Sequence, residues 1–400
     1  MSPETELSRV RMALDSSPEL VIVTNTPTPY RISFFNSLQN ALENRGARLR
    51  VLYCALREPH RHWDLQLDSQ NYPWTIMAGL HPTLRGWHAH INISVIRHLR
   101  LGRPTWIMSA GAWNLPTVLL AAQPLIAGEA CRIFWSEGHA RAVLHPHGPI
   151  AVVRRRALRS YSAFAVPNEA SARFVRREAG AKARVILLPN TVDDEFFSSP
   201  STVDRALSRQ KLGLSPSTSL LVSIAQLEDR KGVTELVSGY ERLAPELRDT
   251  TVLAIIGSGS LKAVLEARAQ ALTCGEIRLP GHLDQMKIRD WLWAADAFVL
   301  ASKLDPNPLS PIEAAFCGLP LLLSRQAGNV DELVHEGVNG FVIEEHDAVS
   351  VAAILRQFLL LDQTARQRMG EASSEIANRA FRRRNVAERF ARELIPDQRR

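Results

Sequence analysis

A polar loop in the last third of the chain carries residues whose types and spacing could do chemistry. Asp305 and Glu313 are separated by seven residues, and the loop follows Ala297–Leu300, an apolar run that predicts a strand. A short helix is predicted to begin at Ser310, which can cap it, with a proline at the first helical position. Because a helix N-terminus presents unpaired amides and a partial positive charge, the amides of Leu309 and Ser310 could bind a diphosphate.

Glu313 lies about one turn inside that predicted helix. Its carboxylate can accept hydrogen bonds from two hydroxyl groups, as the 2′- and 3′-hydroxyls of a ribose would require. A carboxylate beside a diphosphate needs such a role, because the negative charges repel each other. The alternative interpretation is that Glu313 only stabilises the first turn of the helix through the helix dipole.

A second polar loop, residues 226–232, carries two adjacent cations, Arg230 and Lys231. It separates Ser219–Ile224, a predicted buried strand, from an amphipathic helix predicted over Val233–Leu243. The carboxyl ends of parallel strands meet at one edge of a sheet, where ligands bind, so we expect both loops at that edge. A basic pair that stands alone in a loop is usually just solvated. Two loops of complementary chemistry instead predict a sugar-nucleotide site.

Together these residues resemble the retaining glycosyltransferases of family 4, also called glycosyl transferases group 1. That family pairs a G-R-L-x-x-x-K-G loop with an E-x7-E segment that continues into E-A-x-A-x-G-x-P. The matching positions lie within residues 185–345 and are Lys231, Gly232, Glu313, Gly318 and Pro320, with the segments Asn190–Asp193, Gly257–Gly259 and Gly328–Glu332. The resemblance implies the GT-B fold, in which two Rossmann-like, doubly wound α/β domains face each other across a cleft. It also places Gly257 at the donor.

The sequence departs from the family pattern in three places. Asp305 stands where a first glutamate is usual, which keeps the charge but shortens the side chain by one methylene; the resemblance assigns it to the donor sugar. Gln226 takes the place of a phosphate-binding arginine, so Arg230 is expected to supply the missing positive charge beside Lys231. Residues 306–308, Pro-Asn-Pro, replace G-F-G and so remove two backbone donors.

Polar residues also follow two predicted strands in the first half of the chain. Arg31 comes soon after Leu20–Thr24, and Glu137 and His139 follow Ile133–Trp135. In the resembled family this half binds the acceptor, and His139 matches a histidine that touches the donor sugar. Arg31 and Glu137 are therefore expected on the acceptor side. The alternatives are a solvent-facing arginine in a first helical turn and a structural histidine.

The length of 400 residues exceeds what one core normally supports, so two domains are expected. Strand-like and helix-like segments alternate in both halves, which is typical of parallel α/β sheets. We expect an N-terminal acceptor-binding domain over residues 1–195 and a C-terminal nucleotide-sugar domain over residues 196–380. The pattern predicts one helix over Arg379–Leu394, and the resemblance implies that residues 381–400 cross back to the first domain.

The basic charge of the chain is concentrated in its first half. Residues 1–192 hold 23 Lys plus Arg against 12 Asp plus Glu, a net charge of +11, whereas the remainder holds 25 against 29, or −4, for a total of +7. An anionic acceptor or an anionic membrane surface is the natural partner of such a domain. Four arginines, at positions 154–156 and 159, lie among apolar residues in one predicted helix, which could lie on anionic lipid or simply cover the core.

Several features limit other functions. Met1–Glu19 lacks the apolar region of a signal peptide, and no apolar run is long enough to span a bilayer, so we expect a cytoplasmic protein that contacts the inner face of the cell membrane peripherally. The four cysteines are scattered and no D-x-D triplet occurs, so neither a metal nor another cofactor is expected. A nucleic-acid-binding protein is a weak alternative, because the arginines lack interleaved aromatic residues.

The sequence therefore predicts retaining transfer of a sugar from a nucleoside-diphosphate sugar to a hydroxyl acceptor, in the synthesis of a cell-surface polysaccharide or lipid-linked glycan. The predicted catalytic residues are Lys231, Arg230, Asp305 and His139, and the predicted donor-binding residues are Glu313, Leu309, Ser310, Gln226 and Gly257. A sugar-nucleotide epimerase or phosphorylase of the same fold is the alternative enzyme. An inactive, structural relative is a further alternative, because Asp305 and Gln226 depart from the pattern.

Overall fold

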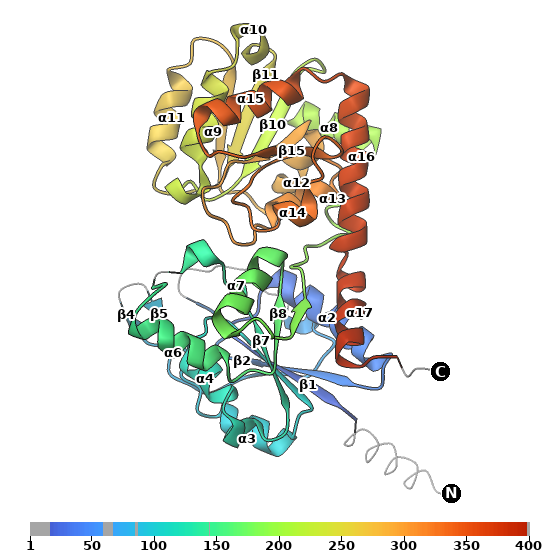
Figure 1. The fold of residues 1–400 in the computed structure, drawn as a ribbon. Helices are drawn as coiled ribbons and strands as arrows, with labels where there is room; N and C mark the ends of the chain where they lie inside the picture. The colour runs from blue at the N-terminus through green and yellow to red at the C-terminus, as the bar shows by residue number, and fades with distance from the viewer. Residues whose placement is uncertain (1–16, 59–66, 85–86, 144, 398–400) are drawn as a thin grey trace, which may run out of the picture. The chain divides into compact units, whose positions relative to one another are not determined.

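The structure is a computed structural model that describes residues 17–58, 67–84, 87–143 and 145–397 (Figure 1). Most of Met1–Glu19, the segment predicted not to be a signal peptide, lies outside the described residues. No single helix among the described residues is both long and apolar enough to cross a bilayer. The helical segments Ala348–Leu359 and Gln363–Leu394 meet that criterion only together, across a bend of 109°.

The chain forms two compact units. The N-terminal unit comprises residues 1–167, 171–188 and 383–400, and the C-terminal unit comprises residues 168–170 and 189–382. In its described part, each unit is built on a parallel sheet with helices packed on both faces. The predicted α/β class with two doubly wound sheets is confirmed.

The elements of the N-terminal unit alternate along the chain, as expected for parallel sheets. Its strands are β1 (Glu19–Thr24), β2 (Arg48–Tyr53), β3 (Trp74–Ile76), β4 (Thr83–Leu84), β5 (Trp87–His88), β6 (Trp106–Ala110), β7 (Cys131–Trp135), β8 (Ala163–Val166) and β9 (Val185–Leu187). Its helices are α2 (Pro29–Glu43), α3 (Val95–Gly102), α4 (Pro116–Ala121), α5 (Pro124–Ala127), α6 (Pro149–Leu158), α7 (Glu169–Ala179) and α17 (Arg383–Leu394), with 3₁₀ turns at Leu67–Ser69 and Ala140–Ala142.

The C-terminal unit has the same kind of alternation. Its strands are β10 (Ser219–Ile224), β11 (Thr251–Ile256), β12 (Glu276–Gly281), β13 (Ala297–Leu300), β14 (Leu321–Ser324) and β15 (Gly340–Ile343). Its helices are α8 (Thr202–Lys211), α9 (Val233–Glu241), α10 (Pro245–Arg248), α11 (Lys262–Gln270), α12 (Gln285–Ala294), α13 (Ser310–Phe316), α14 (Val330–Leu333), α15 (Ala348–Leu359) and α16 (Gln363–Ala380), with a 3₁₀ turn at Asp229–Lys231.

Both sheets reverse their strand order at one internal position. The described strands of the N-terminal sheet run β3-β2-β1-β6-β7-β8-β9, and those of the C-terminal sheet run β12-β11-β10-β13-β14-β15. The reversal therefore falls between β1 and β6 in the first sheet and between β10 and β13 in the second. The loops that leave these strand pairs at their carboxyl ends border the crevice where doubly wound sheets bind ligands.

The central strands are buried on both faces, as the apolar runs in the sequence predict. Along β1, Leu20 and Ile22 pack in one core cluster with α2 and α17, whereas Val21 and Val23 pack in another with α3 and α5. Successive side chains of a strand point to opposite faces, so a strand covered on both sides is apolar at nearly every position.

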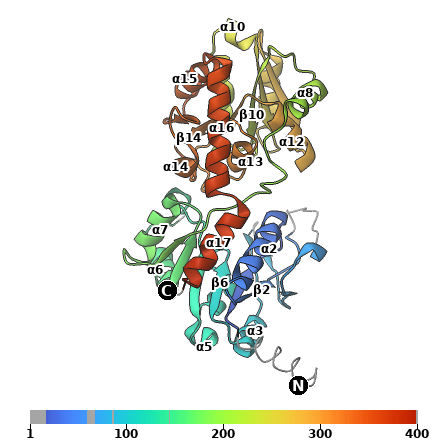
Figure 2. The ribbon, with the colours of Figure 1, turned by 90° about the vertical axis from the view of Figure 1, so that its right-hand side faces the viewer.

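The C-terminal tail forms two helices where the sequence predicts one over Arg379–Leu394. α16 ends at Ala380 and α17 begins at Arg383 (Figures 1 and 2). Phe381 is buried in a core cluster of the C-terminal unit, whereas Phe390 is buried with α2 in the N-terminal unit. The single-helix prediction is wrong because the apolar residues on either side of the break belong to two different cores.

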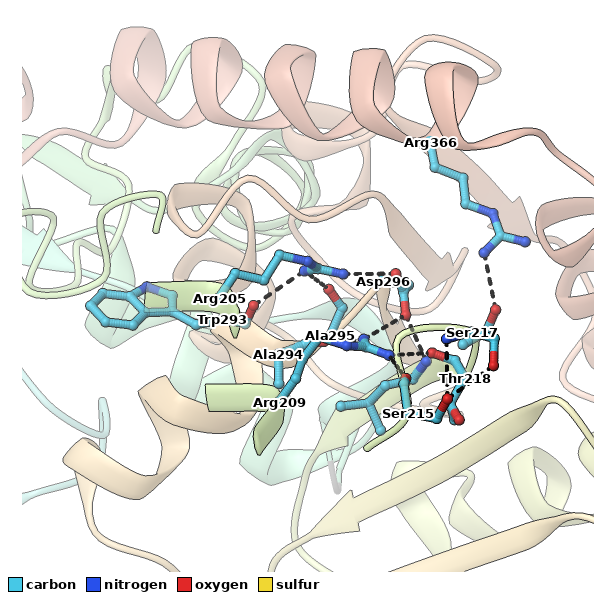
Figure 3. Close-up of polar contacts among 12 residues, drawn as sticks. Arg205, Arg209, Ser215, Ser217, Thr218, Trp293, Ala294, Ala295, Asp296 and Arg366 are labelled. Carbon is cyan, nitrogen blue, oxygen red and sulfur yellow. Dashed lines mark hydrogen bonds and ion pairs between the residues drawn. The ribbon is translucent and has the colours of Figure 1, made fainter. Parts of the chain in front are cut away.

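A charged network ties the beginnings of β10 and β13 to α8 (Figure 3). Arg205 of α8 binds the Asp296 carboxylate at 2.8 Å, and Arg209 binds it at 3.4 Å. The amide of Leu220 in β10 donates to the same carboxylate at 2.7 Å. Arg209 also donates to the carbonyl of Ala294, at the end of α12, at 2.9 Å. Asp296 therefore fixes the ends of β10 and β13 that lie opposite their site loops.

We expect Asp296→Ala to lower the free energy of unfolding of the C-terminal unit by about 3 kcal/mol. The change leaves two guanidinium groups and a backbone amide without their common acceptor. Chemical denaturation followed by tryptophan fluorescence measures the loss. The matched control is Asp290→Ala, whose partner Lys211 is largely exposed, and it should cost less than about 1 kcal/mol. Equal losses in the two variants would contradict the role of Asp296.

Candidate active site

The loop after β10 and the loop after β13 are joined by hydrogen bonds. The amides of Lys303 and Leu304 donate to the carbonyl of Arg230 at 3.0 and 3.1 Å. Farther along, the Ser310 hydroxyl donates to the carbonyl of Ile224, the last residue of β10, at 2.9 Å. These contacts hold the two loops together at the point where the strand order reverses.

Gly232 allows the two loops to approach this closely. It has a φ of +62°, and a Cβ built on it would lie 1.8 Å from the carbonyl oxygen of Ala301. Any other residue would therefore clash with the backbone that follows β13, and the positive φ would strain it as well. The position after Lys231 needs glycine for a reason of packing, independent of any ligand.

Lys231 and Asp305 form an ion pair that connects the loops, in which Nζ donates to Oδ2. Both are largely buried, with 12% and 10% of their side-chain surface exposed. Lys303, in the second loop, binds Asp229 at 2.6 Å and Glu235 at 2.9 Å. Lys303 is not among the predicted residues, and its position in the loop after β13 is the signal that could have identified it.

Lys231 and Asp305, two of the predicted catalytic residues, are therefore in direct contact.

Arg230 lies beside the position where Gln226 replaces an arginine. Its Nη2 atom donates to Gln226 Oε1. This is the arrangement expected if Arg230 supplies the positive charge at that position. Gly257, which follows β11, packs against the same loop, because a Cβ there would lie 1.9 Å from the carbonyl oxygen of Ala225. Four of the predicted site residues therefore belong to one packed loop cluster, which consists of Gln226, Arg230, Lys231 and Gly257.

A third loop, between β14 and α14, supports Asp305 from the other side. The amide of Gly328 donates to the Asp305 carbonyl at 2.8 Å, and the Asn329 side chain donates to the Pro308 carbonyl at 2.8 Å. Gly328 is required there because a Cβ would lie 1.8 Å from the carbonyl oxygen of Pro306. The Pro-Asn-Pro segment, which stands in place of G-F-G, is thus packed against the loop that carries Gly328.

The beginning of α13 differs from the sequence prediction in one respect. Leu309, not Ser310, occupies the N-cap position, and no side chain caps the helix. The prediction that Ser310 caps α13 is wrong because its hydroxyl donates to the end of β10 instead. Within the described residues the amides of Leu309 and Ser310 donate no hydrogen bond, whereas those of Ile312 and Glu313 donate to the Leu309 carbonyl. The two predicted phosphate-binding amides are therefore available.

Glu313 is the fourth residue of α13 and is partly buried. Burial raises the pKa of its carboxyl group to about 7. No hydrogen bond or ion pair to its carboxylate is formed within the described residues. A carboxylate in this state gains from any ligand that donates hydrogen bonds to it. In the part of the chain that is described, no group of three or more His, Cys, Asp or Glu side chains is arranged to hold a metal ion.

The N-terminal unit contains a pocket of about 780 Å³ that the three remaining predicted residues line. Arg31, Glu137 and His139 contribute polar groups to its wall. Its other lining side chains include the aromatic residues Trp113, Phe134, Trp135 and Phe174, and the cation Arg154. Sequence reasoning did not identify this aromatic lining, although Trp135 closes a predicted strand next to Glu137.

Arg31 is held in place by three different contacts. Its Nη1 donates to the Thr24 hydroxyl at 2.6 Å, its Nη2 lies 3.7 Å from Glu137 Oε1, and its guanidinium lies 4.9 Å from the centre of the Trp135 ring. The buried Nε of Arg31 and the buried Nε1 of Trp135 have no hydrogen-bond partner within the described residues. Because buried polar groups are normally paired, these two donors are candidates for binding a ligand in the pocket.

Comparisons with known proteins are consistent with this geometry. Residues 204–375 match the family described as Glycosyl transferases group 1. This segment is a glycosyl transferases group 1 domain. The matched segment holds all eight predicted residues of the C-terminal unit, which are Gln226, Arg230, Lys231, Gly257, Asp305, Leu309, Ser310 and Glu313. Arg31, Glu137 and His139 lie outside it.

Two curated proteins that the chain resembles are glycosyltransferases by name. A D-inositol 3-phosphate glycosyltransferase of Xylanimonas cellulosilytica is 30% identical over 206 residues, which cover 50% of this chain and 48% of that protein. The chain thus spans about half the length of that relative. A GDP-mannose-dependent monoacylated alpha-(1-6)-phosphatidylinositol monomannoside mannosyltransferase of Corynebacterium glutamicum is 23% identical over 370 residues, which cover 90% and 93% of the two chains.

Solved structures share the whole fold. Anabaena HepE in complex with UDP aligns with a TM-score of 0.72 and 18% identity, over 94% of this chain and 99% of that chain. WaaG, a glycosyltransferase involved in lipopolysaccharide biosynthesis, aligns with a TM-score of 0.66 and 16% identity, over 95% and 100%. The likeness shows the fold alone at these identities. It confirms the GT-B class that the resemblance implies.

We expect Glu313→Gln to stabilise the ligand-free protein above neutral pH. Burial raises the pKa of Glu313 from 4.5 to about 7, so between these pH values the folded state holds a proton that the unfolded state has lost. The free energy of unfolding therefore falls as pH rises through this window, and the full cost is present above it. Removing the charge should restore on the order of 2 kcal/mol, a value reduced for partial exposure.

Thermal melts of the two proteins on either side of this window measure the effect. The gain should appear at about pH 8 and be small at about pH 5. Glu371→Gln, on the exposed face of α16, is the matched control and should change the melting temperature little at either pH. A gain that is independent of pH would show that the buried charge is not its cause.

Proposed function

We propose that the protein transfers a sugar, with retention of configuration, from a nucleoside-diphosphate sugar to a hydroxyl acceptor. The observation that carries this proposal is the site of the C-terminal unit. There Lys231 lies in the loop after β10 and Glu313 in the helix that follows the β13 loop, and hydrogen bonds join the two segments at the reversal of the strand order. That position supplies positive charge for a diphosphate and an unpaired carboxylate for the adjoining ribose. Membership of this segment in glycosyl transferases group 1 supports the same assignment.

The donor is proposed to be a sugar linked to UDP or GDP. Anabaena HepE, which shares the fold, was solved with UDP and with UDP-glucose, and the Corynebacterium relative is named as GDP-mannose-dependent. In our proposal Glu313 holds the ribose hydroxyls and Asp305 holds hydroxyls of the sugar. Gln226 and Gly257 form the neighbouring wall of the donor site.

The proposed reaction exchanges one bond at the anomeric carbon of the donor. The bond to the diphosphate oxygen breaks, and the diphosphate leaves with the electron pair. The acceptor oxygen bonds to the same face of that carbon, and its proton passes to a diphosphate oxygen. Lys231, Arg230 and the amides of Leu309 and Ser310 stabilise the negative charge that develops on the leaving group. No protein nucleophile, general base or metal is assigned.

The acceptor is proposed to bind in the pocket of the N-terminal unit. Arg31 and Glu137 would contact it there, and His139 would meet the transferred sugar. The aromatic walls suit the faces of sugar rings, whereas the unpaired Nε of Arg31 suits an anionic group. The two curated relatives named above act on phosphorylated inositol derivatives according to their names, which supports an anionic acceptor. A cell-surface polysaccharide or a lipid-linked glycan is the proposed product class.

We expect Lys231→Ala to reduce sugar transfer by about 100-fold or more while the protein stays folded, because the leaving group loses its nearest fixed cation. The assay is a screen of UDP- and GDP-sugars with candidate acceptors, with products analysed by mass spectrometry in the presence of EDTA. Lys262→Ala, an exposed lysine on α11, is the matched control and should retain activity. A fully active Lys231→Ala protein would remove the central assignment.

The same assay separates the proposal from its rivals. A transferase produces a new glycoside only when the acceptor is present. An epimerase or phosphorylase converts the sugar nucleotide without an acceptor. Salt-sensitive binding of duplex DNA that Lys231→Ala leaves unchanged would favour the nucleic-acid-binding alternative.

We further expect the affinity for UDP to fall when pH is lowered from about 8 to about 6. Burial raises the pKa of Glu313 to about 7, so acidification converts the hydrogen-bond acceptor for the ribose into a neutral acid. Isothermal titration of wild type and Glu313→Gln over this range is the measurement. The variant should bind UDP more weakly, and its affinity should depend less on pH. The pH dependence that remains comes from protonation of the phosphates of UDP itself. Identical pH profiles would contradict the role of Glu313.

A further inference from the structure

The ion pair of Lys231 and Asp305 joins two residues to which the proposed function gives different parts of the donor. Lys231 Nζ donates to Asp305 Oδ2, and both side chains are largely buried. Within the described residues, no other group pairs with this ammonium or with this carboxylate. A donor that presents its diphosphate to Lys231 and its sugar to Asp305 must therefore separate the two charges.

Other contacts already hold the two loops together. The amides of Lys303 and Leu304 donate to the carbonyl of Arg230, and the Ser310 hydroxyl donates to the carbonyl of Ile224 at the end of β10. A buried ion pair usually adds little stability, because the loss of hydration offsets the attraction between its charges. The buried charges of this pair therefore call for an explanation other than loop packing.

The backbone beside the ion pair is fixed, so only the side chains can part. Gly232, next to Lys231, packs against the backbone that follows β13 with no room for a Cβ. Asp305 forms a parallel β-bridge with Ala327, and its carbonyl accepts a hydrogen bond from the Gly328 amide at 2.8 Å. Because the aspartate side chain is short, its carboxylate cannot follow the lysine when the lysine turns to another anion.

Separation of a buried ion pair is costly unless both charges find new partners. A nucleoside diphosphate alone gives Lys231 a new anion, but it leaves the Asp305 carboxylate unpaired beside phosphates that repel it. The sugar of a complete donor supplies hydroxyl groups that donate hydrogen bonds to that carboxylate. Only the nucleotide sugar therefore satisfies both ends of the pair.

We infer that Asp305 makes the site discriminate a nucleotide sugar from the nucleoside diphosphate that remains after transfer. The inference rests on the proposed function. While the sugar is bound, its hydroxyls replace Lys231 at the carboxylate. Once the sugar has left, Asp305 competes with the diphosphate for Lys231 and weakens the binding of the product. The same ion pair thus favours binding of the substrate and release of the spent nucleotide.

Isothermal titration of the full chain with UDP, UDP-glucose, GDP and GDP-mannose, in the presence of EDTA, tests the inference. Asp305→Asn should bind the bare diphosphate about ten-fold more tightly than wild type does, because Lys231 is no longer engaged and the repulsion is removed. The preference for the sugar nucleotide over its diphosphate should fall by about ten-fold or more. Asp229→Asn is the matched control, because it removes the same charge from the loop after β10. Its carboxylate is largely exposed, so each affinity should change by less than about two-fold.

Two outcomes would overturn the inference. One is unchanged or weaker binding of the diphosphate by Asp305→Asn, and the other is an equal gain in Asp229→Asn, which would show a general effect of net charge. Thermal melts establish that the variants are folded, and Asp305→Ser should show the same shift in preference as Asp305→Asn. If wild type and variants bind none of the four nucleotides, the proposed function itself fails. If wild type binds a nucleotide sugar but Asp305→Asn gains no affinity for the diphosphate, only the discrimination by Asp305 is refuted.

Discussion

The placement of β13 directly beside β10 is the constraint on which the C-terminal site depends. Crossover connections between parallel strands are right-handed, so the chain covers one face of the sheet while it builds β10, β11 and β12 and the other face once it turns back to β13. The loops after β10 and β13 therefore start toward opposite faces of the sheet, and backbone hydrogen bonds join them. Gly232 meets the backbone of Ala301 where they join, with no room for a side chain. The site residues are brought together by strand order and backbone packing, before any ligand contributes.

The two sheets share one strand order but carry different chemistry at their reversals. At the β10–β13 reversal the loop side chains form several ion pairs, of which Lys231 with Asp305 is the most buried. Near β1 in the N-terminal unit, the side chains form an aromatic pocket in which Arg31 lies 4.9 Å from the centre of the Trp135 ring. In the proposed function, a common scaffold would thus separate the recognition of a diphosphate from the recognition of a second substrate, because the loops and not the strands supply the functional groups.

Strand-to-loop junctions could be predicted from the sequence because apolar runs and turn residues mark them locally. Such apolar runs predict the positions of both polar loops of the C-terminal unit. They also predict that the residues of these loops share one sheet edge. The contact between Lys231 and Asp305 could not be predicted, because it joins positions 74 residues apart and depends on strand order. The inward direction of Arg154 was missed for the same reason, since its partner Glu178 is on another helix. The break between α16 and α17 was missed because helical periodicity does not reveal that two cores share the segment.

The raised pKa of Glu313 links the two halves of the proposed donor site. At neutral pH the desolvated carboxyl is divided between its neutral and charged forms, with a pKa of about 7. A diphosphate bound at the nearby amides adds negative charge, which by itself would raise the pKa further and favour the neutral form. Two hydroxyls that donate to the carboxylate act in the opposite direction and restore the charged form. Under the proposed function, a ligand with both groups would therefore bind with less internal repulsion than a bare diphosphate, and the protonation of one buried side chain would add to the selection made by direct contacts.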